Sequence, residues 1–399
     1  MKTHSSRRKF WRYFGVGLCW MALMSGIHEW ADRTWLVQRM ETANLDALFS
    51  GKQWKVSPDV VVVSITDDDY QTEFGGISPL NAGKLMEEID AILAGGPRAL
   101  GVDFDTSAWA GPPAKYSGEP IVWAREALGE AGSLTMGKVL GGAEEVCYGV
   151  PAYFPDEDGI VREYKEFIEG ADHKYYPSLA FNLVEVSQRG PQACRGALPN
   201  PDRSQSAELE KVNFRGPRNA FDHLSISALK TLKDLPASAH PLHGKIVLLG
   251  GAYRAARDAY ATPFSYLDGV DIIANTVDMN LPGNKELKDM PVWVNVAGYL
   301  QGVMLLAGLY FVSRTWSLLI HVLVLPVYAL VVNWLAFQWA ATFVSFVPCF
   351  VGIVIHEMVG HATEYHRLQR ENRELHEQMD RLRAAATSSS APSQGEGDG

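Results

Sequence analysis

Apolar residues are gathered into long stretches rather than spread along the chain. Four stretches are each about 20 residues long, which is the length that spans a bilayer; they cover residues 13–31, 292–311, 318–337 and 340–359. A mainly hydrophilic region separates the first stretch from the second. The pattern predicts four transmembrane helices, one before a large domain and three after it.

Basic residues orient this arrangement, because the loops on the cytoplasmic side of a membrane protein are rich in Lys and Arg. Residues 1–12 carry Lys and Arg but no acid, Arg314 lies between the second and third stretches, and the tail after His361 holds several arginines. Both ends are therefore expected in the cytoplasm of a bacterial inner-membrane protein, with the hydrophilic domain in the periplasm. No small-residue cleavage site follows the first stretch, so it is expected to remain as an anchor.

The predicted organisation follows from these boundaries. Residues 1–12 form a basic cytoplasmic N-terminus, 13–31 a membrane helix, 32–290 the outer domain, 291–361 three membrane helices, 362–383 a cytoplasmic coiled coil and 384–399 a disordered tail.

The outer domain has the pattern of an α/β fold. Residues 60–65 (VVVVSI) form a continuous apolar run, as in a strand buried on both faces. A helix follows, with Ser78 as its cap and Pro79 in its first turn, and ends near Gly95. Residues 99–105 form a second strand, and residues 245–250 a third, before a helix over 270–281. Weaker strands over 146–154 and 160–162 flank a turn at 156–159, and a helix covers 178–188. The pattern predicts a mixed or parallel sheet.

These segments together resemble the CHASE type 2 family, the extracytoplasmic sensory domains found before bacterial cyclases and kinases. The matching pieces include the strands at 59–65 and 99–103, the hairpin at 154–162 and the stretch 213–217 (NFRGP). The strongest piece is the run from 244 to 275. It contains residues 244–250 (GKIVLLG), 261–263 (Ala-Thr-Pro) and 269–275 (GVDIIAN). The resemblance covers about residues 45–281, and the family's layout also has one membrane helix before the domain and three after it. It implies a sensor. Only 38 residues follow His361, so we expect no kinase or cyclase output in this chain.

Composition and motifs exclude several other functions. The net charge of −10 disfavours nucleic acid as a partner, because phosphate binding requires a basic surface. His356 and His361 flank Glu357, but they are five residues apart and so point about 140° from each other on a helix, which a zinc peptidase cannot use. The near P-loop at 132–138 has Val139 where a hydroxyl must hold magnesium. The turn at 156–159 lacks the later ligands of a calcium loop. We expect no catalytic residue, metal or cofactor, and therefore no enzyme.

Charged residues follow each of the three predicted strands. Ligands of open α/β sheets bind at the carboxyl ends of the strands, so neighbouring strands would bring these residues to one crevice that holds a polar small molecule or a cation. Local pairing and helix capping are the alternative. The candidates are Asp67, Asp68, Asp103, Asp105, Arg254, Arg257 and Asp258.

Two cysteines, Cys147 and Cys194, lie in the outer domain, where a disulfide could persist. The sequence leaves open whether they pair or remain two small buried thiols.

The tail has a heptad pattern. Its seam consists of Tyr365, Asn372 and Met379 at a positions and of Leu368, Leu375 and Leu382 at d positions. A single a-position asparagine selects a two-stranded parallel register, so the seam predicts a homodimeric coiled coil. A monomeric amphipathic helix is the alternative.

The sequence therefore predicts a membrane sensor without its own output enzyme. An event outside the cell would act through the last membrane helix and the coil on an unknown cytoplasmic partner. The alternative is a structural or scaffolding subunit of an envelope complex, whose outer domain docks a periplasmic protein.

Overall fold

The computed structural model describes most of the outer domain and parts of the remaining chain: residues 34–51, 55–109, 116–129, 134–142, 146–151, 153–199, 209–217, 220–284, 287–289, 324–343 and 365–382. The chain divides into two compact units. The first, called the α/β domain below, comprises Thr42–Met290 and Asn333–Val344. The second comprises Met1–Glu41, Pro291–Val332 and Ser345–Gly399.

A parallel six-stranded sheet forms the centre of the α/β domain. Its strands in spatial order are β12 (Asp222–Ser225), β1 (Val60–Ile65), β13 (Ile246–Gly251), β2 (Ala99–Asp103), β3 (Ile121–Ala124) and β6 (Tyr148–Gly149). The α/β class with a parallel sheet is thus confirmed. The three strands predicted from apolar runs are neighbours, with β13 between β1 and β2. Their carboxyl ends meet at one edge, because Gly250 is in register with both Ser64 and Asp103.

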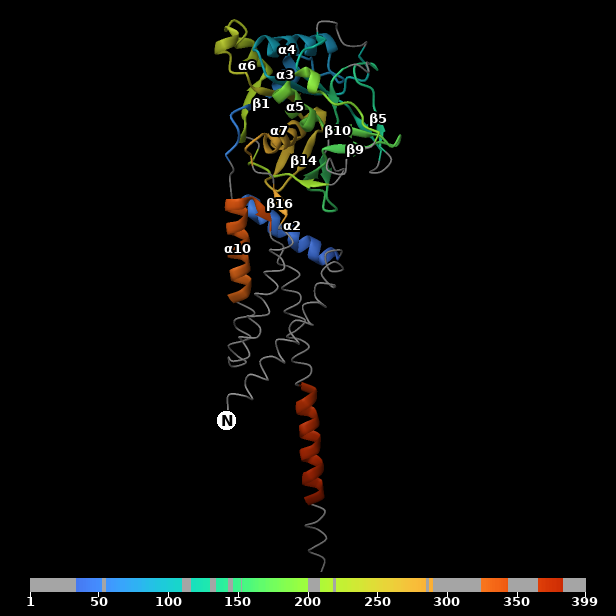
Figure 1. Cartoon of the computed structure of the whole chain (residues 1–399), viewed down its shortest axis with the longest axis vertical. Helices are drawn as coiled ribbons and strands as arrows, with labels where there is room; N and C mark the ends of the chain where they lie inside the picture. The colour runs from blue at the N-terminus through green and yellow to red at the C-terminus, as the bar shows by residue number, and fades with distance from the viewer. Residues whose placement is uncertain are drawn as a thin grey trace, which may run out of the picture. The chain divides into compact units, whose positions relative to one another are not determined.

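Helices cover both faces of this sheet, as Figure 1 shows. On one face lie α3 (Asp67–Thr72), α4 (Ala82–Ala94) and α6 (Ile226–Thr231), and on the other α5 (Leu179–Arg189) and α7 (Gly269–Asn280). Alternation along β1 explains the two layers, since Val61 and Val63 enter the first core and Val60 and Val62 the second. All six residues of β1 are buried, which requires the apolar character seen in its sequence.

The helix after β1 begins later than the sequence analysis predicted. Asn81, not Ser78, caps α4 by accepting a hydrogen bond from the Lys84 N–H. The peptide bond between Ser78 and Pro79 is cis, and the Ser78 hydroxyl lies 3.0 Å from the Tyr70 hydroxyl. The acids at 67–69 belong to the short helix α3, which the sequence analysis did not predict; its capping box joins Thr66 and Asp69.

A third apolar cluster lies beneath a small antiparallel sheet formed by β11 (Glu210–Lys211), β8 (Val161–Tyr164) and β7 (Tyr153–Pro155). The predicted weak strand at 146–154 is therefore two strands, β6 and β7. This cluster also includes residues from α2 (Trp35–Ser50), α10 (Leu325–Ala340) and β17 (Thr342–Phe343). Phe49 of α2 contacts Phe337 of α10 edge to face, with ring centroids 5.3 Å apart. Parallel pairing of β17 with β16 (Lys288–Asp289) completes this end of the domain.

Short elements complete the described fold. They are β4 (Ala127–Leu128) with β5 (Thr135–Met136), β9 (Phe167–Glu169) with β10 (Tyr175–Pro177), β14 (Ala259–Ala261) with β15 (Tyr266–Asp268), and the 3-10 turns η2 (Pro191–Ala193), η4 (Ala237–Ala239) and η5 (Arg254–Ala256).

The predicted membrane segments at 13–31 and 292–311 lie outside the described residues, and those at 318–337 and 340–359 lie partly outside them. None of the helices in the described part of the chain has both the length and the apolar character that crossing a bilayer requires. Residues 365–382 form one helix with every side chain exposed. It contains the whole predicted seam, and the coiled coil itself remains a prediction.

Candidate functional site

The predicted strand-end residues do lie at one edge of the sheet, but their contacts divide them into two groups rather than one mixed-charge crevice. In the first group, Asp67 accepts a hydrogen bond of 2.8 Å from the Arg254 backbone N–H, and the two side chains lie 3.5 Å apart. Both side chains are more than half exposed, at 57% and 95%. This pair contributes little to stability, because water screens exposed charges.

The second group consists of Asp103, Asp258, Tyr153 and Tyr260, and is called the carboxyl–tyrosine cluster below. Asp103 is the last residue of β2, and Asp258 follows η5. The Tyr153 hydroxyl donates a hydrogen bond of 3.3 Å to the Asp258 Oδ1 atom. The Tyr153 and Tyr260 rings meet edge to face, with centroids 4.8 Å apart. Strands β2, β7 and β14 and the loop after β13 thus contribute to one half-buried polar site.

Burial and like charge act together on the two carboxyl groups. Burial, followed by the neighbouring charge of Asp258, raises the pKa of Asp103 to about 8. Burial also raises the pKa of Asp258, although hydrogen bonds from Tyr260 and Tyr153 oppose this shift. For Tyr153, burial and then the charges of both acids raise the pKa. Two such carboxyl groups cannot easily both ionise, so the pair retains a proton near neutral pH.

The amino-terminal end of α7 forms one wall of the cluster. Gly269 starts this helix, and a Cβ atom placed there would lie 2.4 Å from the Asp258 Oδ2 atom. Gly250 of β13 allows the same helix to approach, since its Cβ would lie 2.6 Å from the Val270 Cβ. Both glycines are thus required for close packing rather than for backbone freedom. In the first turn of α7, the buried Asp271 lies 2.9 Å from the His223 Nε2 atom of β12.

The other three predicted residues do not join either group. Asp68 is exposed on α3, and Arg257 is exposed with a left-handed backbone at φ 55°. Asp105 accepts a hydrogen bond of 2.8 Å from the Ser107 N–H, which is a local turn contact. Asp105 thus has a local contact of the kind the structural alternative expects, and ligand binding at these positions remains a prediction.

Sequence analysis missed a second charged site, around Arg162. This guanidinium is buried, with 3% of its side chain exposed, and it binds Asp46 at 2.7 Å, Asp156 at 2.6 Å and Asp158 at 2.9 Å. Burial alone would lower the pKa of Arg162, but its hydrogen bonds to the three acids raise it above its usual value. We call these four residues the Arg162 clamp. The sequence analysis assigned Asp156 and Asp158 only to a turn. The position of Arg162, four residues after Asp158, was the sequence signal that could have indicated an ion pair.

A fully buried ion pair was also missed. The Arg215 Nε atom lies 2.6 Å from the Asp278 Oδ2 atom, with 3% and 0% of the side chains exposed. Asp278 also accepts a hydrogen bond of 2.7 Å from the Ser57 N–H. This pair connects the 213–217 stretch with α7 and with the chain that enters β1, so its role is structural.

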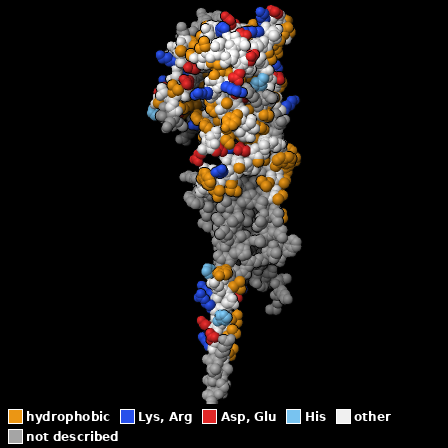
Figure 2. Space-filling view, turned by 180° about the vertical axis from the view of Figure 1, so that it is seen from behind, with side chains coloured by type: hydrophobic (Ala, Val, Ile, Leu, Met, Phe, Trp, Pro, Cys, Tyr) orange, Lys and Arg blue, Asp and Glu red, His pale blue; other side chains and the backbone are white. Residues whose placement is uncertain are grey.

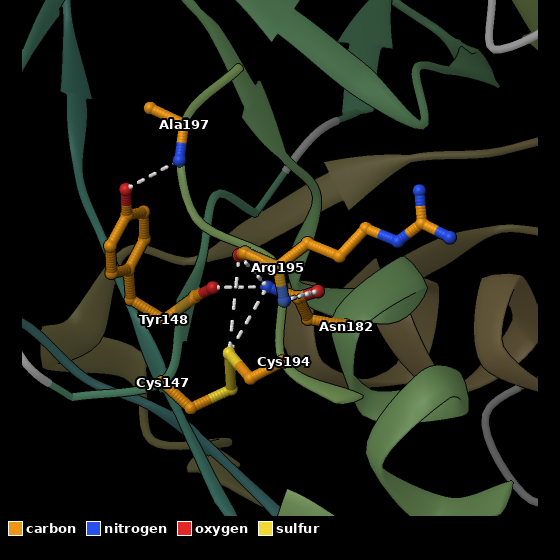
Figure 3. Close-up of a disulfide and its surroundings, with 6 residues drawn as sticks. All are labelled: Cys147, Tyr148, Asn182, Cys194, Arg195 and Ala197. Atoms are coloured by element: carbon orange, nitrogen blue, oxygen red, sulfur yellow. Dashed lines mark hydrogen bonds between the residues drawn. A yellow bond between two sulfur atoms is a disulfide. The ribbon is translucent and has the colours of Figure 1, made fainter. Parts of the chain in front are cut away.

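A disulfide joins Cys147 and Cys194, which the sequence left open. The Cys147–Cys194 disulfide connects the start of β6 with the chain after η2, and its Cα atoms are 5.7 Å apart (Figure 3). Beside it, the Asn182 Nδ2 atom donates to the Tyr148 and Arg195 carbonyls at 2.7 and 2.8 Å. Such a bond is typical of an oxidising compartment.

Within the described residues, no group of three or more His, Cys, Asp or Glu side chains is placed to hold a metal ion.

No curated protein and no solved structure matches the chain. The CHASE2 domain family matches residues 17–312, which is most of the chain and includes the whole sheet and the carboxyl–tyrosine cluster. The chain therefore belongs to the CHASE2 family of extracellular sensory domains.

Proposed function

We propose that this protein is a sensor of the bacterial inner membrane that relays an event in the periplasm to a cytoplasmic partner. In this proposal the α/β domain receives the stimulus at the carboxyl edge of its sheet, and the last membrane helix and a dimeric coil carry it inward. The chain itself binds and relays, and no residue is assigned a catalytic role. Membership of a sensory family supports the first half, and the disulfide supports an outer location for the domain.

The exposed seam of the tail helix is the observation that supports the relay. Leu368, Leu375 and Leu382 are 51%, 57% and 71% exposed. Figure 2 shows apolar side chains along one side of this helix and charged side chains of both signs along the other. Most of the stability of a helix in a protein comes from packing of its amphipathic face rather than from intrinsic propensity. A partner that covers the seam would supply the missing stability.

A second copy of the chain fits this seam best. Asn372 at an a position can pair with its own copy, whereas it would weaken packing against an unrelated apolar groove. Glu371 at a g position faces His376 at an e position of a parallel second copy. Within one helix, Glu371 also binds Arg367 at 3.0 Å, so the flanks of the seam remain charged and soluble.

Site-specific photo-crosslinking in living cells tests this proposal. A photo-reactive residue replaces Leu375 at a d position, and a matched control replaces Glu377, which lies at the f position opposite the seam. We expect the Leu375 variant to give a product of twice the monomer mass and the Glu377 variant to give little.

Each other outcome has a defined meaning. A Leu375 product with a different protein would overturn the homodimer and identify the cytoplasmic partner directly. An absence of product at both positions would overturn the relay and would favour the scaffolding role, in which the outer domain docks a periplasmic protein.

A further inference from the structure

Arg125 is held in a fixed position at the carboxyl edge of the sheet. It directly follows β3, and its backbone N–H donates to the Gly149 carbonyl of β6 at 2.8 Å. Its side chain is half-buried, and the Nε–H group donates to the Gly137 carbonyl at 2.9 Å. The ring centroids of Tyr148 and Tyr176 lie 4.8 and 5.0 Å from its Cζ atom. A hydrogen bond and two cation–π contacts thus orient the guanidinium.

Both tyrosines around this guanidinium are themselves anchored. The Tyr148 hydroxyl accepts a hydrogen bond of 3.2 Å from the Ala197 N–H, and Tyr148 adjoins the disulfide at Cys147 (Figure 3). The Tyr176 hydroxyl donates to the Asp172 Oδ2 atom at 2.8 Å. Both tyrosine side chains are buried. A binding group that is held in this way loses little freedom when a ligand arrives, which favours affinity.

The terminal Nη groups of Arg125 have no hydrogen bond or ion pair among the residues that the structure describes. The buried arginines Arg162 and Arg215 differ in this respect. Arg162 binds three acids at 2.6 to 2.9 Å, and Arg215 lies 2.6 Å from Asp278. A charge that is taken partly out of water requires a partner of opposite sign. Arg125 therefore offers one positive charge and two adjacent donor groups to a molecule from outside.

We propose that Arg125 binds the carboxylate group of a small organic ligand. The two Nη groups hold the two carboxylate oxygens side by side, in the bidentate geometry that arginine forms with carboxylates. Arg125 also lies where open α/β sheets bind their ligands, outside the carboxyl ends of the strands. This inference rests on the proposed sensor function and names the chemical class of ligand that the outer domain receives.

The charges near Arg125 favour a carboxylate over a phosphate. A phosphate group carries about two negative charges at neutral pH, and one arginine supplies a single positive charge. Lys174, which lies just before β10, is already paired with Asp172 at 3.5 Å. The chain's net charge of −10 also disfavours a multiply charged anion. A singly charged carboxylate matches this site in both charge and shape.

Fluorine NMR of small probes tests this inference on the full chain in lipid nanodiscs. Fluoroacetate presents the carboxylate with almost nothing else attached, and fluoroacetamide is its uncharged counterpart of nearly the same shape. We expect the native chain to raise the fluorine relaxation rate of fluoroacetate and not that of fluoroacetamide. Acetate should reverse this rise, and inorganic phosphate at the same ionic strength should reverse it less. Empty nanodiscs measure the contribution of the lipid.

Variants of two arginines give the test its controls. Arg125→Gln removes the charge and should weaken fluoroacetate binding by about tenfold or more. Arg125→Lys keeps the charge without the planar fork and should recover only part of the affinity. Arg98→Gln changes an exposed arginine at the opposite, amino end of β2, where it pairs with Asp59 at 3.3 Å. It should bind fluoroacetate as the native chain does.

A chemical measurement on the native chain serves if Arg125→Gln fails to fold. Phenylglyoxal modifies accessible guanidinium groups, and peptide mass spectrometry reads the rate at each arginine. Acetate should slow the reaction at Arg125 and leave the rate at Arg98 unchanged. Equal rates at Arg125 with and without acetate would contradict the proposed site.

The probes and the crosslinking report independently. Equal relaxation of fluoroacetate and fluoroacetamide with the native chain would overturn the inference, as would an unchanged affinity in Arg125→Gln. Stronger displacement by phosphate than by acetate would refute the carboxylate as the ligand class. A dimer crosslinked at Leu375 without carboxylate binding would refute the ligand and leave the proposed sensor function standing. Carboxylate binding without that dimer would refute the relay and leave the binding site standing.

Discussion

Removal of the Cys147–Cys194 disulfide should weaken the α/β domain mainly through the unfolded chain. The bond closes a loop with a sequence separation of 47 residues. The double variant Cys147→Ala/Cys194→Ala removes this constraint. It leaves the neighbouring Asn182 hydrogen bonds to Tyr148 and Arg195 in place, so the folded arrangement around the bond keeps a second connection.

Loop length sets the expected magnitude. The chain-entropy relation for a loop with a separation of 47 residues gives about 4 kcal/mol at 25 °C. Both cysteines are only partly buried at the edge of the second core, so the loss of packing should add little. The entropy of the unfolded chain therefore dominates the effect.

Pulse proteolysis of the full chain in nanodiscs, in increasing urea, measures the free energy of unfolding of the outer domain. The free energy of unfolding of the native chain should fall by about 4 kcal/mol when reductant is added. The double variant should start at this lower value and should not respond to reductant, which makes it the control for side effects of the reductant. Asn182→Ala, in contrast, should destabilise the oxidised and reduced chains equally.

A loss below about 1 kcal/mol on reduction would refute this reasoning, because it would mean that the unfolded chain gains almost no freedom when the loop opens. If Asn182→Ala destabilised only the reduced chain, the expectation that the disulfide and the Asn182 hydrogen bonds contribute independently would be refuted. The two connections would then substitute for each other in the folded state.

Three further predictions concern the core and the acid pair. Arg215→Ala should lower the free energy of unfolding, measured by urea denaturation, by about 3–5 kcal/mol, since it leaves the buried Asp278 carboxylate without its cation. Arg215→Lys should recover part of this loss. Gly250→Ala should cost about 1–3 kcal/mol by forcing α7 away from β13 at Val270, and a neutral effect would contradict the packing. The folded-state pKa of Asp103 lies above 3.8, so the folded state binds the extra proton and stability should fall as pH rises from about 4 to about 8. Asp103→Asn should flatten that decline in thermal unfolding measured across the pH range.

The sequence by itself determined the elements whose patterns are local. The apolar runs located β1, β2 and β13 within a residue or two, because a strand covered on both faces can carry few polar side chains. The helix predicted over 178–188 is α5, which Ser178 caps and which ends at Gly190, since capping depends on residues that are neighbours in the chain. The family resemblance also came from short segments read in order.

The sequence pattern did not predict the structure where neighbouring residues are compatible with more than one cap or element. Ser78 and Asn81 are both good helix caps. In the structure Asn81 caps α4, and the Ser78 hydroxyl lies near the Tyr70 hydroxyl instead. The three acids after β1 were equally compatible with a loop and with the short helix α3. In such places the tertiary contacts, here between Asp69 and Ser227, decide between conformations of similar intrinsic energy.

Only the tertiary structure decided which charges meet. The sequence left open whether the charged residues at the strand ends line one crevice or pair locally. In the structure Arg254 pairs with Asp67 in solvent, whereas burial and the charge of Asp258 act on Asp103. Tyr153 lies 105 residues from Asp258 in the chain, and Arg162 lies 116 residues from Asp46. No pattern of spacing encodes such contacts, because they depend on strand order and on how closely α7 approaches the sheet.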